Sequence, residues 1–229
     1  MVSNALTGVE LKSKVFKFGL LSSFAFFCTI FISAGSFLFW QAWLLFLCIM
    51  GSVTRVVLYF LKNDQKLLER RMSFHEKEYQ QQFIVKISML FFCVGLIVAG
   101  LDYRLSLSKV PLVIVLLSDF MIVLGYRIIF LVFKANSFAA RTIEVMEGQK
   151  VITSGPYSIV RHPMYVGVIV IFLFFPLALA SFWSILFFLP VIPLVVWRII
   201  NEEFVLCRDL YGYENYVKNV KYRLVPYLW

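Results

Sequence analysis

Long apolar segments separated by short polar ones dominate the pattern along the chain. A helix needs about 20 mostly apolar residues to cross a bilayer, and six segments come close to that length. They span residues 18–36, 37–61, 83–101, 110–133, 164–180 and 182–200. The fifth contains Pro176 and the sixth contains Pro190 and Pro193, and proline in a membrane helix often marks a kink. We therefore predict an all-α, polytopic membrane bundle of about six transmembrane helices.

The amino-acid composition supports the same class. Of the 229 residues, 61% are hydrophobic and only 15% are charged, whereas a soluble domain is nearer half apolar and about a quarter charged. This surplus of apolar surface argues against a water-soluble domain. The length allows one compact bundle, so we expect residues 1–229 to form a single integral membrane domain. Within it, we expect a four-helix part over residues 1–135 and a second part over residues 136–229.

The net charge of +9 does not change the predicted fold class. In a soluble protein it would suggest nucleic acid as a partner, but the chain has no zinc-finger spacing and no basic recognition helix, so we expect none. Its four cysteines form no CxxC or metal-binding spacing, so we predict no metal site and no disulfide framework. The oligomeric state is left open.

Basic residues instead indicate how the segments cross the membrane, because cytoplasmic loops are enriched in lysine and arginine. Clusters precede the first segment, occupy the 62–82 and 134–161 connections, and follow the sixth segment. Six crossings with both termini in the cytoplasm fit this alternation. We expect the 62–82 connection to be solvated and partly helical. The small size and short loops favour a bacterial inner membrane, with the polar motifs described next on the cytoplasmic side.

The densest cluster of polar and turn-forming residues is ITSGPYSIVRHPMYVG, residues 152–167. Pro163 fits the first turn of the fifth helix, whose free N–H groups attract an anion. Tyr157 and Tyr165 offer faces for a cation or a base, and His162 can move a proton. S-adenosylmethionine carries an anion, a cation and an aromatic ring, and the chain lacks the glycine-rich phosphate loops that nucleotide cofactors use. An interfacial turn with tyrosines of the aromatic belt is the alternative.

A second cluster, WRIINEE, spans residues 197–203 at the end of the sixth segment. Arg198 and Glu202 are four residues apart and share one helix face. The carboxylate of Glu202 could bind an ammonium group, and the guanidinium of Arg198 could hold a carboxylate. The alternative is a polar cap on the helix, with charges that pair in water.

One carboxylate, Asp119, falls within the fourth apolar segment, with Arg127 eight residues later. A charge at such depth is costly and is a candidate for function. Asp119 could line a substrate cavity, form an inward-facing pair with Arg127, or bond to a neighbouring helix. We favour one of the two structural roles.

Together, the two clusters resemble the isoprenylcysteine carboxyl methyltransferase family, which belongs to a wider group that includes phospholipid N-methyltransferases. The resemblance rests on GPYSIVRHPMYVG, on RIINEEFVLCRDLYGYENYVKNVKYRLVP after two short apolar segments, and on the lead-in NSFAARTIEVMEGQKVITSGPY. It covers residues 136–226. Asn219 departs from it, because the family often has a tyrosine there.

The resemblance implies a membrane enzyme that uses S-adenosylmethionine. The implied cofactor-binding residues are Gln149, Lys150, Val151, Ile152, Tyr157, His162, Pro163, Met164, Tyr165 and Glu202. It also implies that Arg198 binds the substrate and orients it for the reaction. Residues 136–229 would thus form the cofactor-binding part, with membrane lipids and a hydrophobic or lipid-bearing methyl acceptor as partners.

A carboxylate acceptor is already ionised at neutral pH, so Arg198 would only need to orient it. An amine acceptor, as in phosphatidylethanolamine-type N-methylation, would benefit from a base, for which His162 or Glu203 is a candidate. We expect a carboxylate acceptor, with the phospholipid amine as the alternative. Further alternatives are an NADPH-dependent sterol-type membrane reductase and a membrane protein without enzymatic activity.

Overall fold

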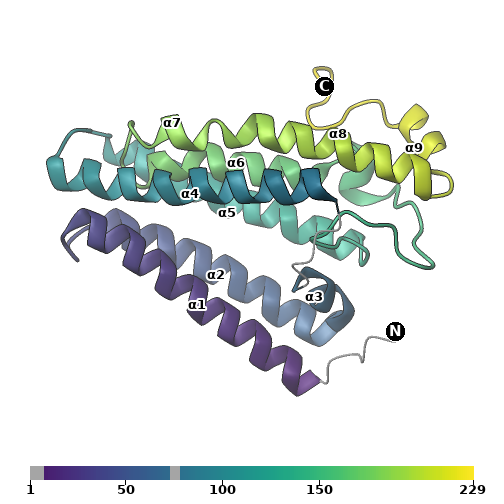
Figure 1. The fold of residues 1–229 in the computed structure, drawn as a ribbon, viewed down its shortest axis with the longest axis horizontal. Coiled ribbons are helices and arrows are strands. Elements are labelled where there is room, and N and C mark those ends of the chain that lie inside the picture. Colours follow the sequence, from purple (N-terminus) through teal and green to yellow (C-terminus); the bar gives the residue numbers. More distant parts are fainter. Residues whose placement is uncertain (1–7, 73–77) are drawn as a thin grey trace.

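The computed structural model describes residues 8–72 and 78–229 (Figure 1), and over these residues the regular secondary structure is entirely helical, with no strands. The elements are α1 (Gly8–Ala34), α2 (Trp40–Asn63), α3 (Gln65–Arg71), α4 (Tyr79–Leu105), α5 (Leu112–Ala135), the 3₁₀ turn η1 (Gly155–Ser158), α6 (Pro163–Ala178), α7 (Ile185–Phe188), α8 (Val191–Asp209) and α9 (Tyr213–Asn219).

The predicted all-α membrane bundle is confirmed. Helices α1, α2, α4, α5 and the α7–α8 stretch are long and apolar enough to cross a membrane, and α6 is a shorter apolar helix. These six match the predicted segments in order. The start of α1 and the C-terminus lie at the same end of the bundle (Figure 1), as an even number of crossings requires. We call this the pocket end. Its placement in the cytoplasm stays a prediction.

Three boundaries differ from the predicted ones. Helix α1 begins ten residues before position 18, because its basic first turns continue the helix beyond the apolar run. The break before α2 lies at Gly35, whose φ of +64° suits glycine. Helix α8 continues to Asp209, nine residues past position 200. The 197–203 cluster therefore lies inside a helix, and not at its end.

Two of the prolines act as predicted. Pro190 separates α7 from α8, since a proline cannot donate the N–H bond that would continue the helix. Pro163 is the first residue of α6, again as predicted. Pro176 lies inside α6, near its end.

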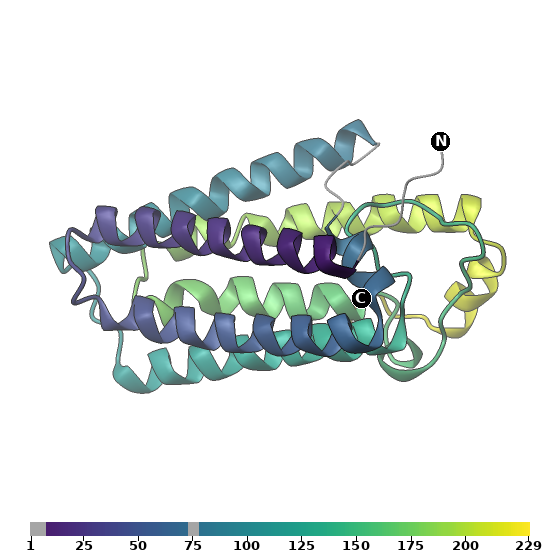
Figure 2. The same cartoon turned by 90° about the horizontal axis from the view of Figure 1, so that it is seen from below.

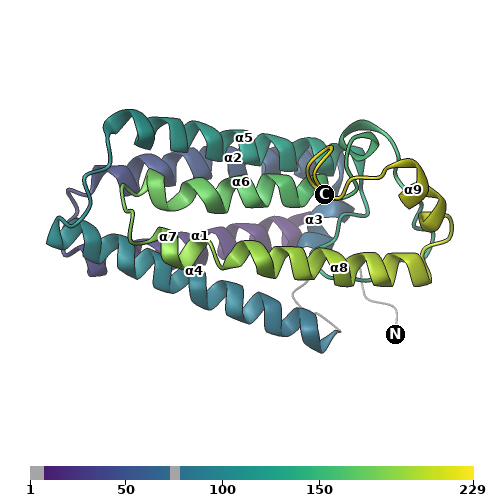
Figure 3. The ribbon, with the colours of Figure 1, turned by 90° about the horizontal axis from the view of Figure 1, so that it is seen from above.

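The helices form two layers. The α1–α2 hairpin lies on one side, and α4, α5, α6 and α8 form the other (Figures 1 and 2). Helices α5 and α6 run side by side (Figure 3) and approach closely at a pair of glycines. A Cβ added at Gly167 would lie 2.7 Å from the carbonyl oxygen of Gly125. Small residues at a crossing are typical of helix packing in membranes.

The 62–82 connection is helical in part but not simply solvated. Within α3, Leu67 and Leu68 are buried, and the Asp64 carboxylate accepts a hydrogen bond from the Leu67 N–H at 3.0 Å. At the start of α4, Gln81 is also buried. The expected solvated, partly helical connection is therefore confirmed only in part, because Leu67 and Leu68 pack against Phe60 and Val132. Residues 73–77 lie outside the described part of the chain.

Asp119 is buried within α5, and neither of its oxygens has a hydrogen-bond partner among the described residues. Arg127 is exposed on the same helix. Eight residues correspond to about 12 Å along a helix, which is too far for an ion pair. The two predicted structural roles of Asp119, a pair with Arg127 or a hydrogen bond to a neighbouring helix, are therefore not seen.

Candidate active site

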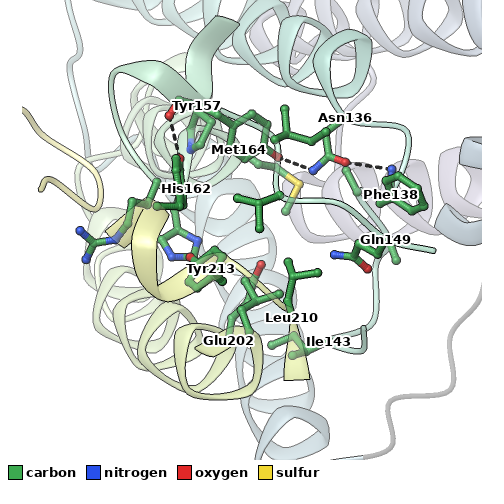
Figure 4. Close-up of a pocket in the computed structure, with 18 of the residues that line it drawn as sticks. Asn136, Phe138, Ile143, Gln149, Tyr157, His162, Met164, Glu202, Leu210 and Tyr213 are labelled. Atoms are coloured by element: carbon green, nitrogen blue, oxygen red, sulfur yellow. Dashed lines mark hydrogen bonds between the residues drawn. The ribbon is translucent and has the colours of Figure 1, made fainter. Parts of the chain in front are cut away.

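A cavity of about 800 Å³, including the part open to solvent, lies at the pocket end (Figure 4). It is formed by the loop after α5, by η1, by the first turn of α6, and by the ends of α8 and α9. Its lining consists of Asn136, Phe138, Ala139, Ala140, Thr142, Ile143, Glu144, Gln149, Lys150, Val151, Ile152, Tyr157, Arg161, His162, Pro163, Met164, Tyr165, Glu202, Leu206, Leu210, Tyr213 and Tyr216.

Backbone bonds to the C-terminal tail hold the RHP sequence in place. The Arg161 N–H donates to the Tyr222 carbonyl at 2.9 Å, and the His162 N–H donates to the Arg223 carbonyl at 3.0 Å. His162 is the residue that precedes α6, and Pro163 opens the helix without needing an N–H partner. The tail thus fixes the point where the turn becomes a helix.

The Glu203 carboxylate lies at the centre of a buried ionic cluster. One oxygen accepts from Arg161 Nε at 2.6 Å and lies 3.2 Å from His162 Nε2, and the other accepts from Arg223 Nε at 2.7 Å. Arg161 also donates to the carbonyls of Val220 and Lys221, each at 2.8 Å. Buried charges need such partners. Glu203 therefore fastens α8 to the start of α6 and to the tail.

The neighbouring Glu202 faces the cavity instead. Its Oε2 accepts a 2.6 Å hydrogen bond from the Tyr165 hydroxyl, which in turn accepts one from Arg198 Nε at 3.1 Å. Arg198 also donates to Gln81 Oε1 and to the Arg141 carbonyl, both at 2.8 Å. The guanidinium of Arg198 is therefore held in one orientation behind the cavity wall, where it connects α8, α6, α4 and the loop after α5.

Besides Tyr165, three further tyrosines line the cavity, and their hydroxyls differ in their hydrogen bonds. The Tyr157 hydroxyl accepts from Asn136 at 3.0 Å, and the Tyr157 carbonyl accepts from the Tyr216 hydroxyl at 2.7 Å. Burial raises the pKa of Tyr157 to about 12, so this tyrosine stays neutral at physiological pH. Tyr213 is also buried, but its hydroxyl has no partner among the described residues.

Two arginines of α3 support the loop that forms one wall. Arg70 donates to the Ser137 carbonyl at 2.5 Å, and Arg71 donates to the Ala140 carbonyl at 2.8 Å. Arg71 also lies over the ring of Phe133, 4.8 Å from its centroid. Desolvation lowers the pKa of Arg71 to about 10, which still leaves it charged at neutral pH.

All the residues that the resemblance implied for the cofactor line this one cavity, from Gln149 through Tyr165, together with Glu202. Arg198 lies one hydrogen bond away, through Tyr165. Their roles in binding and catalysis remain predictions. No group of three or more metal-ligating side chains is found among the described residues.

Sequence reasoning missed several members of the site. Tyr213 and Tyr216 were inside the quoted YGYENY motif, but no role was assigned to them. Gln81 and Arg71 gave no signal, because they reach the site from a connection more than 50 residues away along the chain. Glu203, considered as a base, is instead held by three partners.

The comparison with known families agrees with this geometry. Residues 113–214 match the family model described as phospholipid methyltransferase. The match starts in α5 and ends in α9, so it contains every residue that lines the cavity except Tyr216. It favours neither a reductase nor a protein without enzymatic activity. The predicted resemblance to this group is thereby confirmed, and the match of residues 113–214 supports a membrane methyltransferase.

Proposed function

We propose that this protein transfers a methyl group from S-adenosylmethionine to a carboxylate on a hydrophobic or lipid-bearing acceptor, as isoprenylcysteine carboxyl methyltransferases do. The observation that carries the proposal is the chain Glu202–Tyr165–Arg198. It places a carboxylate on the cavity wall and a firmly held guanidinium directly behind it.

The cavity suits S-adenosylmethionine in its chemistry. Glu202 can bind the ammonium of the amino-acid moiety, and the aliphatic side chains of Val151, Leu206 and Leu210 offer an apolar surface for the adenine. The unpartnered hydroxyl of Tyr213 is a buried polar atom that a ligand could satisfy. The cofactor, when bound, supplies a methyl group on a sulfonium and a neutral thioether as leaving group.

The protein's own contribution is then orientation and charge. A carboxylate acceptor is ionised at neutral pH and needs no base. The positive charge of Arg198 can attract and orient it, and the bonds of Arg198 to Gln81 and to the Arg141 carbonyl keep the guanidinium in place. Holding two reactants in line removes much of the entropic cost of their meeting.

N-methylation of a phospholipid amine is the second candidate. The description of the family model supports it, and so does the environment of His162. If Glu203 is ionised, Nε2 of His162 carries the proton that faces it at 3.2 Å. Nδ1 then remains as the ring nitrogen able to accept a proton from an amine. The two candidates therefore differ in their need for His162.

The first test is calorimetric titration of S-adenosylmethionine into the detergent-purified protein. We expect saturable binding, weakened roughly 10- to 100-fold in Glu202→Gln, because a hydrogen bond to a charged group contributes about 1.5–3 kcal/mol. Asp209→Asn is the matched control on the same helix, since its carboxylate is exposed and pairs with Arg208. A folded parent protein that does not bind S-adenosylmethionine would overturn the proposal.

Transfer of labelled methyl to a prenylcysteine analogue and to phosphatidylethanolamine then separates the two acceptors. We expect the prenylcysteine analogue to be methylated, Arg198→Gln to raise its KM, and His162→Gln to retain much of the rate. Methylation of the amine alone, abolished in His162→Gln, would contradict the carboxylate proposal while leaving the cofactor in place.

A further inference from the structure

A second groove, separate from the cavity, lies between α2 and α5. It is lined by residues of both helices, among them Ser52, Arg55, Phe120, Val123, Arg127 and Phe130. None of its lining residues belongs to the cavity at the pocket end. It measures about 600 Å³, including the part open to its surroundings, and its walls are largely apolar.

Two arginines lie at matching depths in this groove. Arg55 lies eight residues before Asn63, the last residue of α2, and Arg127 lies eight residues before Ala135, the last residue of α5. At 1.5 Å per residue, each is about 12 Å from the pocket end of its helix. Because α2 and α5 pack together and run in the same direction, both charges belong to one level of the bundle.

Both arginines carry a positive charge in this largely apolar groove. Among the described residues, neither guanidinium has an acidic partner, and the one recorded contact is that of Arg127 with the ring of Phe130, 5.2 Å from its centroid. Both side chains are exposed. A charge within an apolar segment is costly unless it is paired or reaches the interface. Two unpaired like charges in one groove also repel each other, so an anion between them would remove both costs.

From this charge complementarity we propose that the groove binds an anionic phospholipid, such as phosphatidylglycerol. The phosphate lies between Arg55 and Arg127, which can reach toward the interface. One acyl chain follows the apolar wall formed by Phe120 and Val123 toward the middle of the bilayer. The groove shares no residue with the cavity. A lipid bound in it would contact both α2 and α5, and so join the α1–α2 hairpin to the segment that matches the family model.

Native mass spectrometry of the full chain tests this directly, after incubation with phosphatidylglycerol or with zwitterionic phosphatidylcholine. We expect phosphatidylglycerol to be retained in preference to phosphatidylcholine. In Arg55→Gln/Arg127→Gln its retention should fall at least tenfold, because each hydrogen bond to a charged group is worth about a tenfold change in affinity or more. Excess inorganic phosphate should not displace the lipid, since the acyl chain contributes to binding.

Lys12→Gln/Lys14→Gln is the matched control, because it removes two exposed positive charges from α1. If the glutamine variant loses helical content by circular dichroism, Arg55→Lys/Arg127→Lys replaces it, and this variant should retain phosphatidylglycerol. Equal retention of the two lipids by the parent protein, or unchanged retention of phosphatidylglycerol in the folded glutamine variant, would overturn the proposal. So would a dimer of the parent protein that the glutamine variant loses while neither binds lipid.

Discussion

Each end of the bundle is built around a buried carboxylate, but the two ends use different partners. At the end away from the pocket, Asp102 accepts hydrogen bonds from the Ser108 N–H at 2.7 Å and from the hydroxyls of Ser108 and Ser181 at 2.6 and 2.5 Å. At the pocket end, Glu203 accepts from two guanidinium groups and contacts His162. Neutral donors hold one carboxylate, and charged donors hold the other.

The difference reflects what each cluster has to hold together. Asp102 fastens the turn after α4 to the turn after α6, and turn residues supply its hydroxyls within short loops. Glu203 gathers three elements far apart in the sequence, and long arginine side chains can reach across that space. Its cluster also leaves the adjacent Glu202 available to the cavity. We therefore infer that the Glu203 cluster supports both the fold and the cavity, whereas the Asp102 cluster supports the fold alone.

We expect the largest loss of stability from Glu203→Ala. It leaves two guanidinium groups without their carboxylate, of which Arg161 is buried. Breaking a buried ion pair from one side costs about 3–5 kcal/mol. We expect a loss of this size in the free energy of unfolding, measured by titration with sodium dodecyl sulfate.

The same variant should also weaken binding of S-adenosylmethionine, because Arg161 and His162, which line the cavity, lose their contact with Glu203. Glu203→Gln, which keeps the shape and part of the hydrogen bonding, should fall between the parent protein and Glu203→Ala. If Glu203→Ala unfolds like the parent protein, the cluster does not hold the pocket end together.

At the other end of the bundle, we expect a smaller loss of stability from Asp102→Ala. Its donors are neutral, so the loss is that of buried hydrogen bonds, about 1–3 kcal/mol. The same unfolding titration measures it. Affinity for S-adenosylmethionine should stay unchanged, since the cavity lies at the opposite end of the bundle. A large fall in affinity in a folded Asp102→Ala protein would contradict the division between the two ends.

The sequence predicted the helices and the cavity residues, but not the difference between the two carboxylate clusters. Hydrophobic segments and prolines predict the bundle because burial in lipid acts on each segment by itself. The cavity residues from Gln149 to Tyr165 were found because they lie close together in the chain and match a motif.

Contacts between distant segments could not be found in this way. The motif and the face shared with Arg198 predicted a role for Glu202 in the site. Nothing local showed that the next residue, Glu203, is held by Arg161 and Arg223 on another side of the helix. Likewise, Gln81 looks like a loop residue until α4 is seen to begin beside Arg198. Such pairings depend on how helices pack, which residue patterns do not encode.

The smallest effect is expected from Asp209→Asn, at the pocket end but on its surface. Asp209 pairs with Arg208 at 2.7 Å, and both side chains are well exposed. Exposed ion pairs contribute little, because water and salt screen them. We expect no measurable change in unfolding or in affinity for S-adenosylmethionine, even though Leu206 and Leu210 on either side of this pair line the cavity. A clear loss of stability or of affinity would mean that the charges at the pocket end act through their summed electrostatic field. The Glu203 cluster would then not differ in kind from the exposed charges around it.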